Sequence, residues 1–118
     1  MQMLRQLRKR AEFVRAARGI RAGRSAFSLQ AIASTGEMPG IGYTVTKKTG
    51  NSPQRNRIKR RLRAAARACA AEFLPQNDYV IVGRREALVA NFAALVRDLS
   101  SSIVKVHSTR ADGPRKPK

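Results

Sequence analysis

Acidic residues are scarce in this chain of 118 residues, and none lies between Glu37 and Glu72. The seven carboxylates are scattered singly along the sequence, as Glu12, Glu37, Glu72, Asp78, Glu86, Asp98 and Asp112. A hydrolytic active site needs a general base or metal-binding carboxylates brought together. The single histidine, His107, has no histidine, cysteine or acid at metal-ligand spacing. We therefore expect no catalytic residue and no metal ligand in the protein.

Cysteine and tryptophan are also rare, since the chain has one cysteine, Cys69, and no tryptophan. A lone cysteine on an apolar helix stripe usually behaves as a small buried hydrophobe. No apolar run is long enough for a spanning helix or the core of a signal peptide. An interfacial helix would need large apolar side chains opposite its basic face, and the main helix here is rich in alanine instead. We therefore expect no membrane partner and a cytoplasmic location.

Positive charge is abundant, because 25 basic side chains give a net charge of +18. Most of these side chains fall in three clusters, at 5–24, 47–67 and 105–118. A charge of this size is informative about partners rather than about fold, and nucleic acid is the leading candidate.

The central basic cluster lies on one predicted helix. Ser52 as N-cap and Pro53 at the first helical position mark its start, and Pro75 stops it after residue 73 or 74. Its packing stripe repeats at helical spacing, with Ile58, Leu62, Ala65, Cys69 and Phe73. The opposite side presents Asn56, Arg60, Arg63 and Arg67. Because arginine forks onto phosphate, this side predicts a surface that binds a polyanion.

The remaining pattern predicts one small α+β domain over residues 1–107. The expected elements are a short helix at 11–18, strands at 25–32, 41–48 and 79–82, the long helix, and a last helix from residue 88. The long helix joins the second strand to the third, which makes a βαβ unit if those strands are parallel. We expect a sheet of three to four strands with the helices mostly on one face.

The two ends of the chain are predicted to lie outside this packed domain. Residues 1–10 are expected to be a flexible basic arm, and residues 108–118 a disordered basic tail rich in proline and glycine.

Two adjacent motifs closely resemble the signature of the bacterial ribonuclease P protein subunit. Residues 42–51 read G-Y-T-V-T-K-K-T-G-N, and residues 55–63 carry the pattern R-N-R-x-K-R-x-x-R. The sequence D-Y-V-I-V at 78–82 and the stretch 7–13 resemble the family's flanking elements. The resemblance covers about residues 7–100.

The resemblance implies a two-layer α+β sandwich like domain 2 of ribosomal protein S5. Its βαβ crossover would be left-handed, against the usual right-handed rule. The protein would bind the catalytic RNA subunit and the 5′ leader of precursor tRNA as a monomer in a one-to-one complex. It would assist Mg²⁺-dependent endonucleolytic removal of the leader, with Mg²⁺ required by the holoenzyme and the chemistry carried by the RNA.

The motif also implies site residues. The expected RNA contacts are Arg55, Asn56, Arg57, Lys59, Arg60, Arg63, Arg67, Lys47 and Lys48. The expected leader-cleft residues are Phe13, Phe27, Tyr43, Arg15 and Arg18, with ordinary core packing as the alternative for Phe27 and Tyr43. Ala17 and Gln30 stand at two cleft positions that are often aromatic in the family. Gly50 is expected to adopt a positive φ in the turn.

Two other functions fit the charge. A ribosomal or general RNA-binding structural protein would have the same electrostatics. A DNA-binding module would place the arginine helix in a major groove, but the chain lacks a second helix at helix-turn-helix spacing and a dimer seam.

Overall fold

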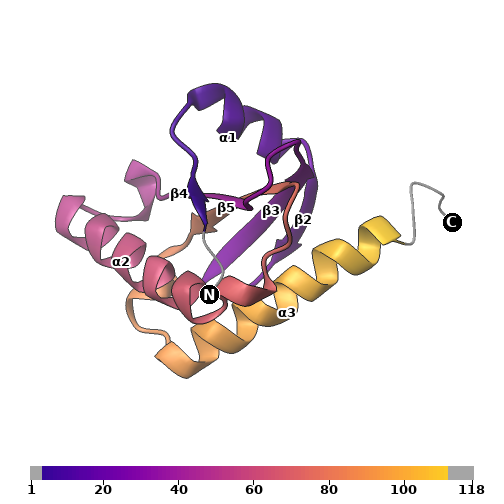
Figure 1. The fold of residues 1–118 in the computed structure, drawn as a ribbon. Coiled ribbons are helices and arrows are strands. Elements are labelled where there is room, and N and C mark those ends of the chain that lie inside the picture. The colour runs from indigo at the N-terminus through magenta and orange to yellow at the C-terminus, as the bar shows by residue number, and fades with distance from the viewer. Residues whose placement is uncertain (1–3, 112–118) are drawn as a thin grey trace, which may run out of the picture.

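A mixed β-sheet forms the centre of the computed structural model, which describes residues 4–111 (Figure 1). Within these residues the sheet has five strands in the order β1-β4-β5-β3-β2. Their bounds are Arg5–Gln6 (β1), Ile20–Gly23 (β2), Phe27–Ala33 (β3), Gly40–Thr44 (β4) and Asn77–Gly83 (β5). β4 runs parallel to β1 and β5, whereas β3 runs antiparallel to β5 and β2. The predicted α+β class is confirmed, with more strands than expected.

The long helix α2 (Ser52–Ala68) joins β4 to β5, which lie side by side and parallel. This confirms the expected βαβ unit, and the handedness of its crossover stays a prediction. Gly83 on β5 allows a close approach, since a Cβ there would lie 2.8 Å from Cγ2 of Ile58 and 3.0 Å from Cδ1 of Leu62.

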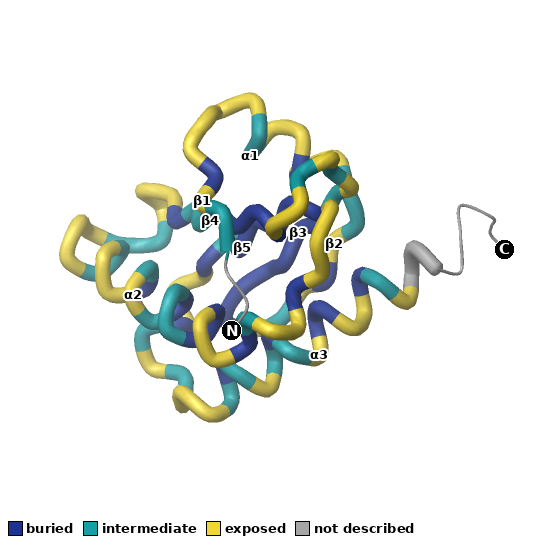
Figure 2. The backbone as a smooth tube through the Cα atoms, viewed as in Figure 1, coloured by how far each residue is buried: buried dark blue, intermediate teal, exposed yellow. Residues whose placement is uncertain are grey.

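Helices cover both faces of the sheet unequally. α2 and α3 (Phe92–Ala111) pack on one face over the main core, and α1 (Arg10–Ala17) packs on the other (Figures 1 and 2). Strand β3 shows the division, because Phe27, Leu29 and Ala31 belong to the main core while Ile32 packs under α1. Successive side chains of β3 therefore point to opposite faces of the sheet.

The start of α2 differs from the prediction. Asn51, not Ser52, is the N-cap: its side-chain oxygen accepts from the backbone N–H of Gln54 at 2.9 Å, and the Gln54 side chain accepts from the Asn51 N–H at 2.9 Å. This reciprocal capping box satisfies two N–H groups that the helix leaves open. The helix ends at Ala68 with Cys69 as C-cap, and the 3-10 turn η2 (Ala70–Glu72) follows.

The turn before α2 also corrects two expectations. β4 ends at Thr44, and the 3-10 turn η1 (Lys47–Thr49) replaces the predicted end of the strand. Gly50 has φ 163°, which is extended backbone rather than the left-handed region. A Cβ there would lie 2.5 Å from Oε1 of Gln54, so a larger residue would displace the side chain that completes the cap of α2.

The N-terminal segment is ordered from residue 4, so the prediction of a flexible arm is wrong for residues 4–10. Residues 5 and 6 pair with β4, and the N–H of Leu7 donates to the carbonyl of Ile41 at 2.9 Å. Leu7 is 4% exposed and packs with Ala16 and Val80 beneath α1. Burial of this apolar side chain outweighs the charge of the basic residues around it. Residues 1–3 lie outside the described part of the chain.

The C-terminal helix also extends further than predicted. α3 continues to Ala111, so residues 108–111 are helical rather than part of a tail. Residues 112–118 lie outside the described part of the chain. His107 on α3 lies against the sheet, with its Nε2 atom 2.6 Å from the hydroxyl of the buried Tyr79. Among residues 4–111 no helix is both long enough and apolar enough to cross a membrane.

Candidate nucleic-acid interface

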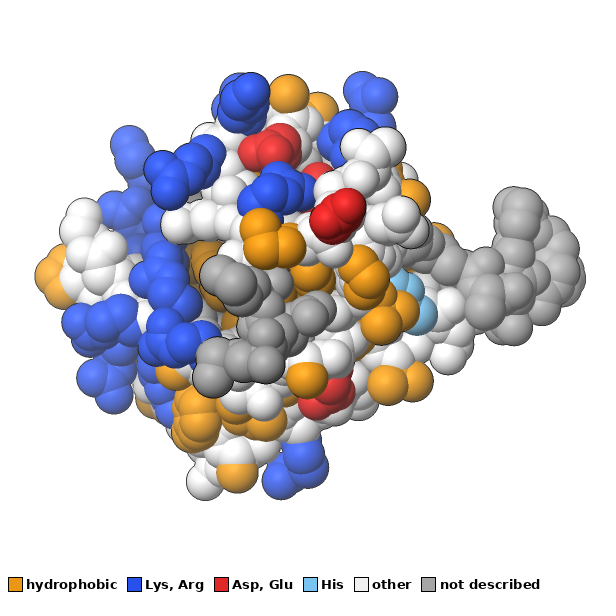
Figure 3. Space-filling model, viewed as in Figure 1, with side chains coloured by type: hydrophobic (Ala, Val, Ile, Leu, Met, Phe, Trp, Pro, Cys, Tyr) orange, Lys and Arg blue, Asp and Glu red, His pale blue; other side chains and the backbone are white. Residues whose placement is uncertain are grey.

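The exposed side of α2 carries most of the central basic cluster. The helix contains seven basic side chains and no acid. Six of them, together with Asn56, make up what we call the basic face: Arg55, Arg57, Lys59, Arg60, Arg63 and Arg67. Figure 3 shows Lys and Arg side chains gathered along the side of the molecule where α2 lies. The buried stripe of Ile58, Leu62 and Ala65 turns this face outward.

Few groups within the protein neutralise the basic face. Arg55 donates to the hydroxyl of Ser52 at 2.9 Å, and the guanidinium of Arg63 lies 5.2 Å from the ring centroid of Tyr43. The other side chains of the basic face form no hydrogen bond or ion pair with any residue in 4–111. Like charges along one helix repel each other, so this surface stabilises the fold poorly and favours an anionic partner.

The seventh basic residue of α2 points into the protein. Arg61 donates from Nη1 to the carbonyl of Ala87 and from Nη2 to the carbonyl of Ala90, each at 2.6 Å. These bonds join α2 to the segment between the 3-10 turn η3 (Arg85–Leu88) and α3. Arg61 is therefore a structural residue inside a run of arginines that looks uniform in the sequence.

Lys47 and Lys48 lie on η1, directly before the N-terminus of α2. Both side chains are exposed and have no hydrogen-bond or ion-pair partner in the described residues. The structure thus places both lysines beside the start of the basic face, although on a 3-10 turn and not on the predicted strand.

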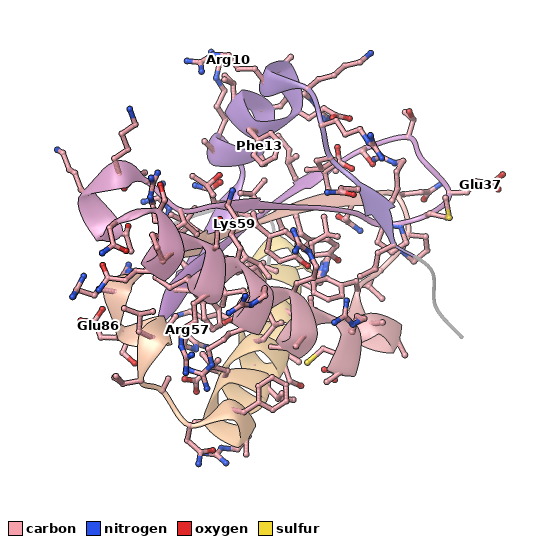
Figure 4. The ribbon with its side chains drawn as sticks, turned by 90° about the vertical axis from the view of Figure 1, so that its left-hand side faces the viewer. Arg10, Phe13, Glu37, Arg57, Lys59 and Glu86 are labelled. Atoms are coloured by element: carbon pink, nitrogen blue, oxygen red, sulfur yellow. The ribbon has the colours of Figure 1, made fainter. Side chains whose placement is uncertain are left out.

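A groove lies on the opposite face of the sheet, between α1 and the strands. It has a volume of about 530 Å³. Its lining consists of Arg8, Arg10, Phe13, Val14 and Ala17 along one wall and Gln30, Thr44, Val80 and Val82 on the sheet. We call this the α1 groove. Figure 4 shows Phe13 pointing from α1 toward the sheet and Arg10 on the outer side of the helix.

Phe13 and Gly42 fit together at the floor of the α1 groove. A Cβ on Gly42 would lie 2.7 Å from Cε2 and Cζ of the Phe13 ring. The absence of a side chain at Gly42 therefore lets the ring rest on β4 and keeps it at the groove. The prediction that Phe13 belongs to a cleft agrees with this position.

The other predicted cleft residues lie elsewhere. Phe27 is 1% exposed and packs in the main core, so its assignment to the cleft is wrong. Tyr43 also packs against the main core, on the side of the sheet away from the groove. The side chain of Arg15, on α1, donates to the carbonyl of Ala33 and does not line the groove. Arg18 is exposed but does not line the groove either. Phe27 and Tyr43 lie on strands, where successive side chains point to opposite faces of the sheet, and this alternation places both on the face away from the groove.

Sequence reasoning missed most of the residues that line the α1 groove. Val80 and Val82 alternate with core residues on β5, and the apolar run at 79–82 gave no sign of which pair faces the groove. The start of α1 must be known before Arg8, Arg10 and Val14 can be assigned to the groove. Ala17 and Gln30, the two positions expected at the cleft, do line it.

Ion pairs stabilise α1 on the side away from the α1 groove. Asp78 on β5 accepts from Nη2 of Arg5 at 2.5 Å, and its other oxygen lies 3.7 Å from Nη1 of Arg15. Arg5 also pairs with Glu12 at 3.2 Å. The carboxylate of Glu12 accepts from the backbone N–H groups of Lys9 and Arg8, and these bonds lower its pKa. These contacts join β1 and α1 to the beginning of β5.

Cys69 and the acids offer little chemistry. Burial, and to a lesser extent the charge of Glu72, raises the pKa of the Cys69 thiol to about 11, so the thiol is protonated at neutral pH. Its exposure of 1% confirms the prediction of a buried hydrophobe. In the described part of the chain, no three His, Cys, Asp or Glu side chains lie close enough together to hold a metal ion.

Comparison with known proteins identifies the family. The family model described as Ribonuclease P matches residues 1–107. The "Ribonuclease P protein component" of Brucella suis is 42% identical over 125 residues, which span 98% of this chain and 88% of that protein. The chain belongs to the ribonuclease P protein family. This confirms the resemblance seen in the sequence and makes the chain a subunit of ribonuclease P, an enzyme of tRNA processing.

Other family members agree in sequence and in fold. The ribonuclease P protein component of Gluconacetobacter diazotrophicus is 45% identical over 103 residues, covering 84% of this chain and 88% of that protein. The fold is similar to that of RNase P protein from Thermotoga maritima, with a TM-score of 0.70, 20% identity and coverage of 81% and 92% of the two chains. A mutant RNase P protein from Staphylococcus aureus gives a TM-score of 0.73 at 23% identity, covering 87% of each chain.

Proposed function

We propose that this chain binds the catalytic RNA subunit of ribonuclease P through the basic face and the lysines of η1. The observation that carries the proposal is the row of cations on α2, none of which forms an ion pair with the described residues. Each phosphate that such a cation neutralises releases counterions, which makes the binding strong at low salt and steeply salt-dependent. Arginine predominates over lysine on this face, and its planar fork suits phosphate oxygens.

The α1 groove is the proposed site for the single-stranded 5′ leader of precursor tRNA. It combines an aromatic ring, Phe13, with two apolar strand residues and with Arg8 and Arg10 near its rim. Single strands bind where bases pack on such surfaces while cations follow the backbone. The groove and the basic face lie on opposite faces of the sheet, so leader and RNA subunit are bound at the same time.

The RNA subunit carries the chemistry in this proposal, and Mg²⁺ is required by the assembled holoenzyme. The protein neutralises phosphate repulsion and positions the leader, so that the phosphodiester before the mature 5′ end is hydrolysed. Two of its acids, Glu12 and Asp78, are engaged by arginines. The protein acts as a monomer, one per RNA subunit, in the cytoplasm.

Cleavage of precursor tRNA by a bacterial ribonuclease P RNA at low Mg²⁺, with and without this protein, tests the proposal. We expect cleavage at the mature 5′ end only when both are present and none by the protein alone. The same Mg²⁺ dependence with and without protein would refute it. If the protein binds RNA tightly but does not restore cleavage at low Mg²⁺, and binds leader-bearing and leaderless tRNA with equal affinity, it is a structural RNA-binding protein instead.

Substitutions on α2 test the role of the basic face. Arg57→Gln with Arg60→Gln should weaken binding to the RNA subunit and lower the slope of log K against log salt by about 0.7–0.9 for each phosphate that is no longer neutralised. The matched control is Arg97→Gln, an exposed arginine on α3. An equal weakening in the control would indicate non-specific attraction by net charge.

A further inference from the structure

A second hollow lies at the edge of β4, on the α2 side of the sheet. It has a volume of about 160 Å³ and is lined by Leu4, Gln6, Ile41, Tyr43, Arg63 and Arg67. Strand β1 pairs with β4 at Gly40 and Ile41, and the paired residues Gln6 and Ile41 both line the hollow. Its lining contains no acidic side chain.

The hollow contains a cation–π pair. The guanidinium of Arg63 lies 5.2 Å from the centroid of the Tyr43 ring, and Tyr43 and Leu4 pack against the main core. The core therefore holds the tyrosine from below. Burial raises the pKa of Tyr43, although Arg63 and Arg67 act against this, and the phenol stays protonated at neutral pH. A guanidinium over an aromatic ring makes a cation–π pair, and arginine and tyrosine are both side chains against which an unpaired base can stack.

The other polar groups of the hollow are available to a ligand. Arg67 lies one turn after Arg63 on α2, so the two guanidinium groups project from the same side of the helix. Neither has a hydrogen-bond or ion-pair partner within residues 4–111, and the same holds for the side-chain amide of Gln6. Two cations, an amide and an apolar floor match the phosphate, base edge and base face of a nucleotide.

We propose that this hollow binds one unpaired nucleotide of the RNA that lies on the basic face, with its base against Tyr43 and Arg63 and its phosphate at Arg67. The nucleotide is unpaired because a base within a duplex has its faces covered by its neighbours. The inference rests on the proposed function, since the RNA on the basic face is the RNA subunit. It assigns Tyr43 to the RNA subunit and not to the leader.

Substitution of Tyr43 tests the inference. Tyr43→Leu removes the ring but keeps an apolar side chain against the core, and Tyr43→Phe keeps the ring. We expect Tyr43→Leu to weaken binding to the RNA subunit by about 5-fold to 100-fold, the usual effect of removing one stacked base, and Tyr43→Phe to bind nearly as well as the wild type. The matched control is Phe92→Leu, which removes a partly exposed ring on α3.

Salt dependence separates stacking from charge. The weakening caused by Tyr43→Leu should be the same at low and high salt, whereas Arg67→Gln should reduce the salt slope by about 0.7–0.9. Unfolding in urea establishes that each variant is folded at the binding temperature. Discrimination between leader-bearing and leaderless precursor tRNA should stay as in the wild type for Tyr43→Leu.

Three results would overturn the inference. Wild-type affinity of Tyr43→Leu for the RNA subunit would show that no base stacks there. If Tyr43→Leu abolished leader discrimination and left the affinity for the RNA subunit unchanged, Tyr43 would belong to the leader site. Failure of the wild-type protein to bind the RNA subunit would refute the proposed function, and the inference with it, so the two failures are distinguishable.

Discussion

Asp78→Asn tests whether the ion pairs behind α1 hold one wall of the α1 groove. The carboxylate is 4% exposed and lies between Arg5, at 2.5 Å, and Arg15, at 3.7 Å. Asparagine has nearly the same shape but no charge, so the substitution removes the electrostatic attraction while leaving the packing in place.

The expected cost follows from the exposure of the partners. A hydrogen bond to a charged group contributes about 1.5–3 kcal/mol, and breaking a fully buried ion pair costs about 3–5 kcal/mol. The side chains of Arg5 and Arg15 are 33% and 50% exposed, so water solvates both when the carboxylate is gone. We therefore expect Asp78→Asn to lower the free energy of unfolding by about 2 kcal/mol. Arg15→Gln should cost less than Asp78→Asn, because its ion pair is longer and its side chain, which also donates to the carbonyl of Ala33, is more exposed.

Urea unfolding measures the stability. The ratio of holoenzyme affinities for tRNA with and without the 5′ leader, which we call leader discrimination, measures the function of the α1 groove. Asp78→Asn should reduce leader discrimination, because α1 loses its anchor on β5, while affinity for the RNA subunit is kept. Asp98→Asn is the matched control, since its carboxylate forms no ion pair with the described residues. Unchanged stability of Asp78→Asn, or an equal destabilisation in Arg15→Gln, would refute this reasoning.

Three other substitutions or conditions test separate parts of the structure. Gly42→Val should displace the ring of Phe13 and reduce leader discrimination, measured with the same pair of substrates, without weakening RNA-subunit binding. Arg61→Ala should lower the free energy of unfolding by about 1–3 kcal/mol, because two partly buried hydrogen bonds from a charged donor are lost, and below its melting temperature it should bind RNA better than variants of the outward arginines. Acidification should loosen the start of α1: Glu12 has a lowered pKa in the folded protein, so its contribution is complete above the unfolded value of about 4.3 and is lost as pH falls through the lower folded value. Protection factors of the α1 amides, which are corrected for the intrinsic pH dependence of exchange, should fall below a pH of about 4.3, and unchanged protection factors would contradict the last expectation.

Most of the elements with strong periodicity could be predicted. The stripe of Ile58 and Leu62 placed the inner face of α2, and the expected strand at 25–32 matches most of β3. The short strands β1 and β2 could not be predicted, because two to four residues are too few for a period to show. The capping box of Asn51 was missed because Ser52-Pro53 offered a plausible start one residue later.

The candidate site divides in the same way. The predicted cations of α2 lie on one outward face, since helical geometry alone determines which side each occupies. The α1 groove was largely missed because its residues come from a helix and three strands that meet only when the sheet forms. Arg61 and Arg60 are neighbours in one basic run, and only the position of the carbonyls of Ala87 and Ala90 separates a structural arginine from an exposed one.

The sequence by itself determined the basic helix and the family and predicted a polyanionic partner, because charge, helical period and motif spacing are local properties of the chain. Tertiary structure decided which aromatic ring serves which surface. Phe13 reaches the α1 groove because Gly42 leaves room for it. Tyr43, one residue further along β4, points to the opposite face and lies under Arg63. Successive side chains of a strand alternate between faces, so the assignment depended on knowing which helix covers each face of the sheet.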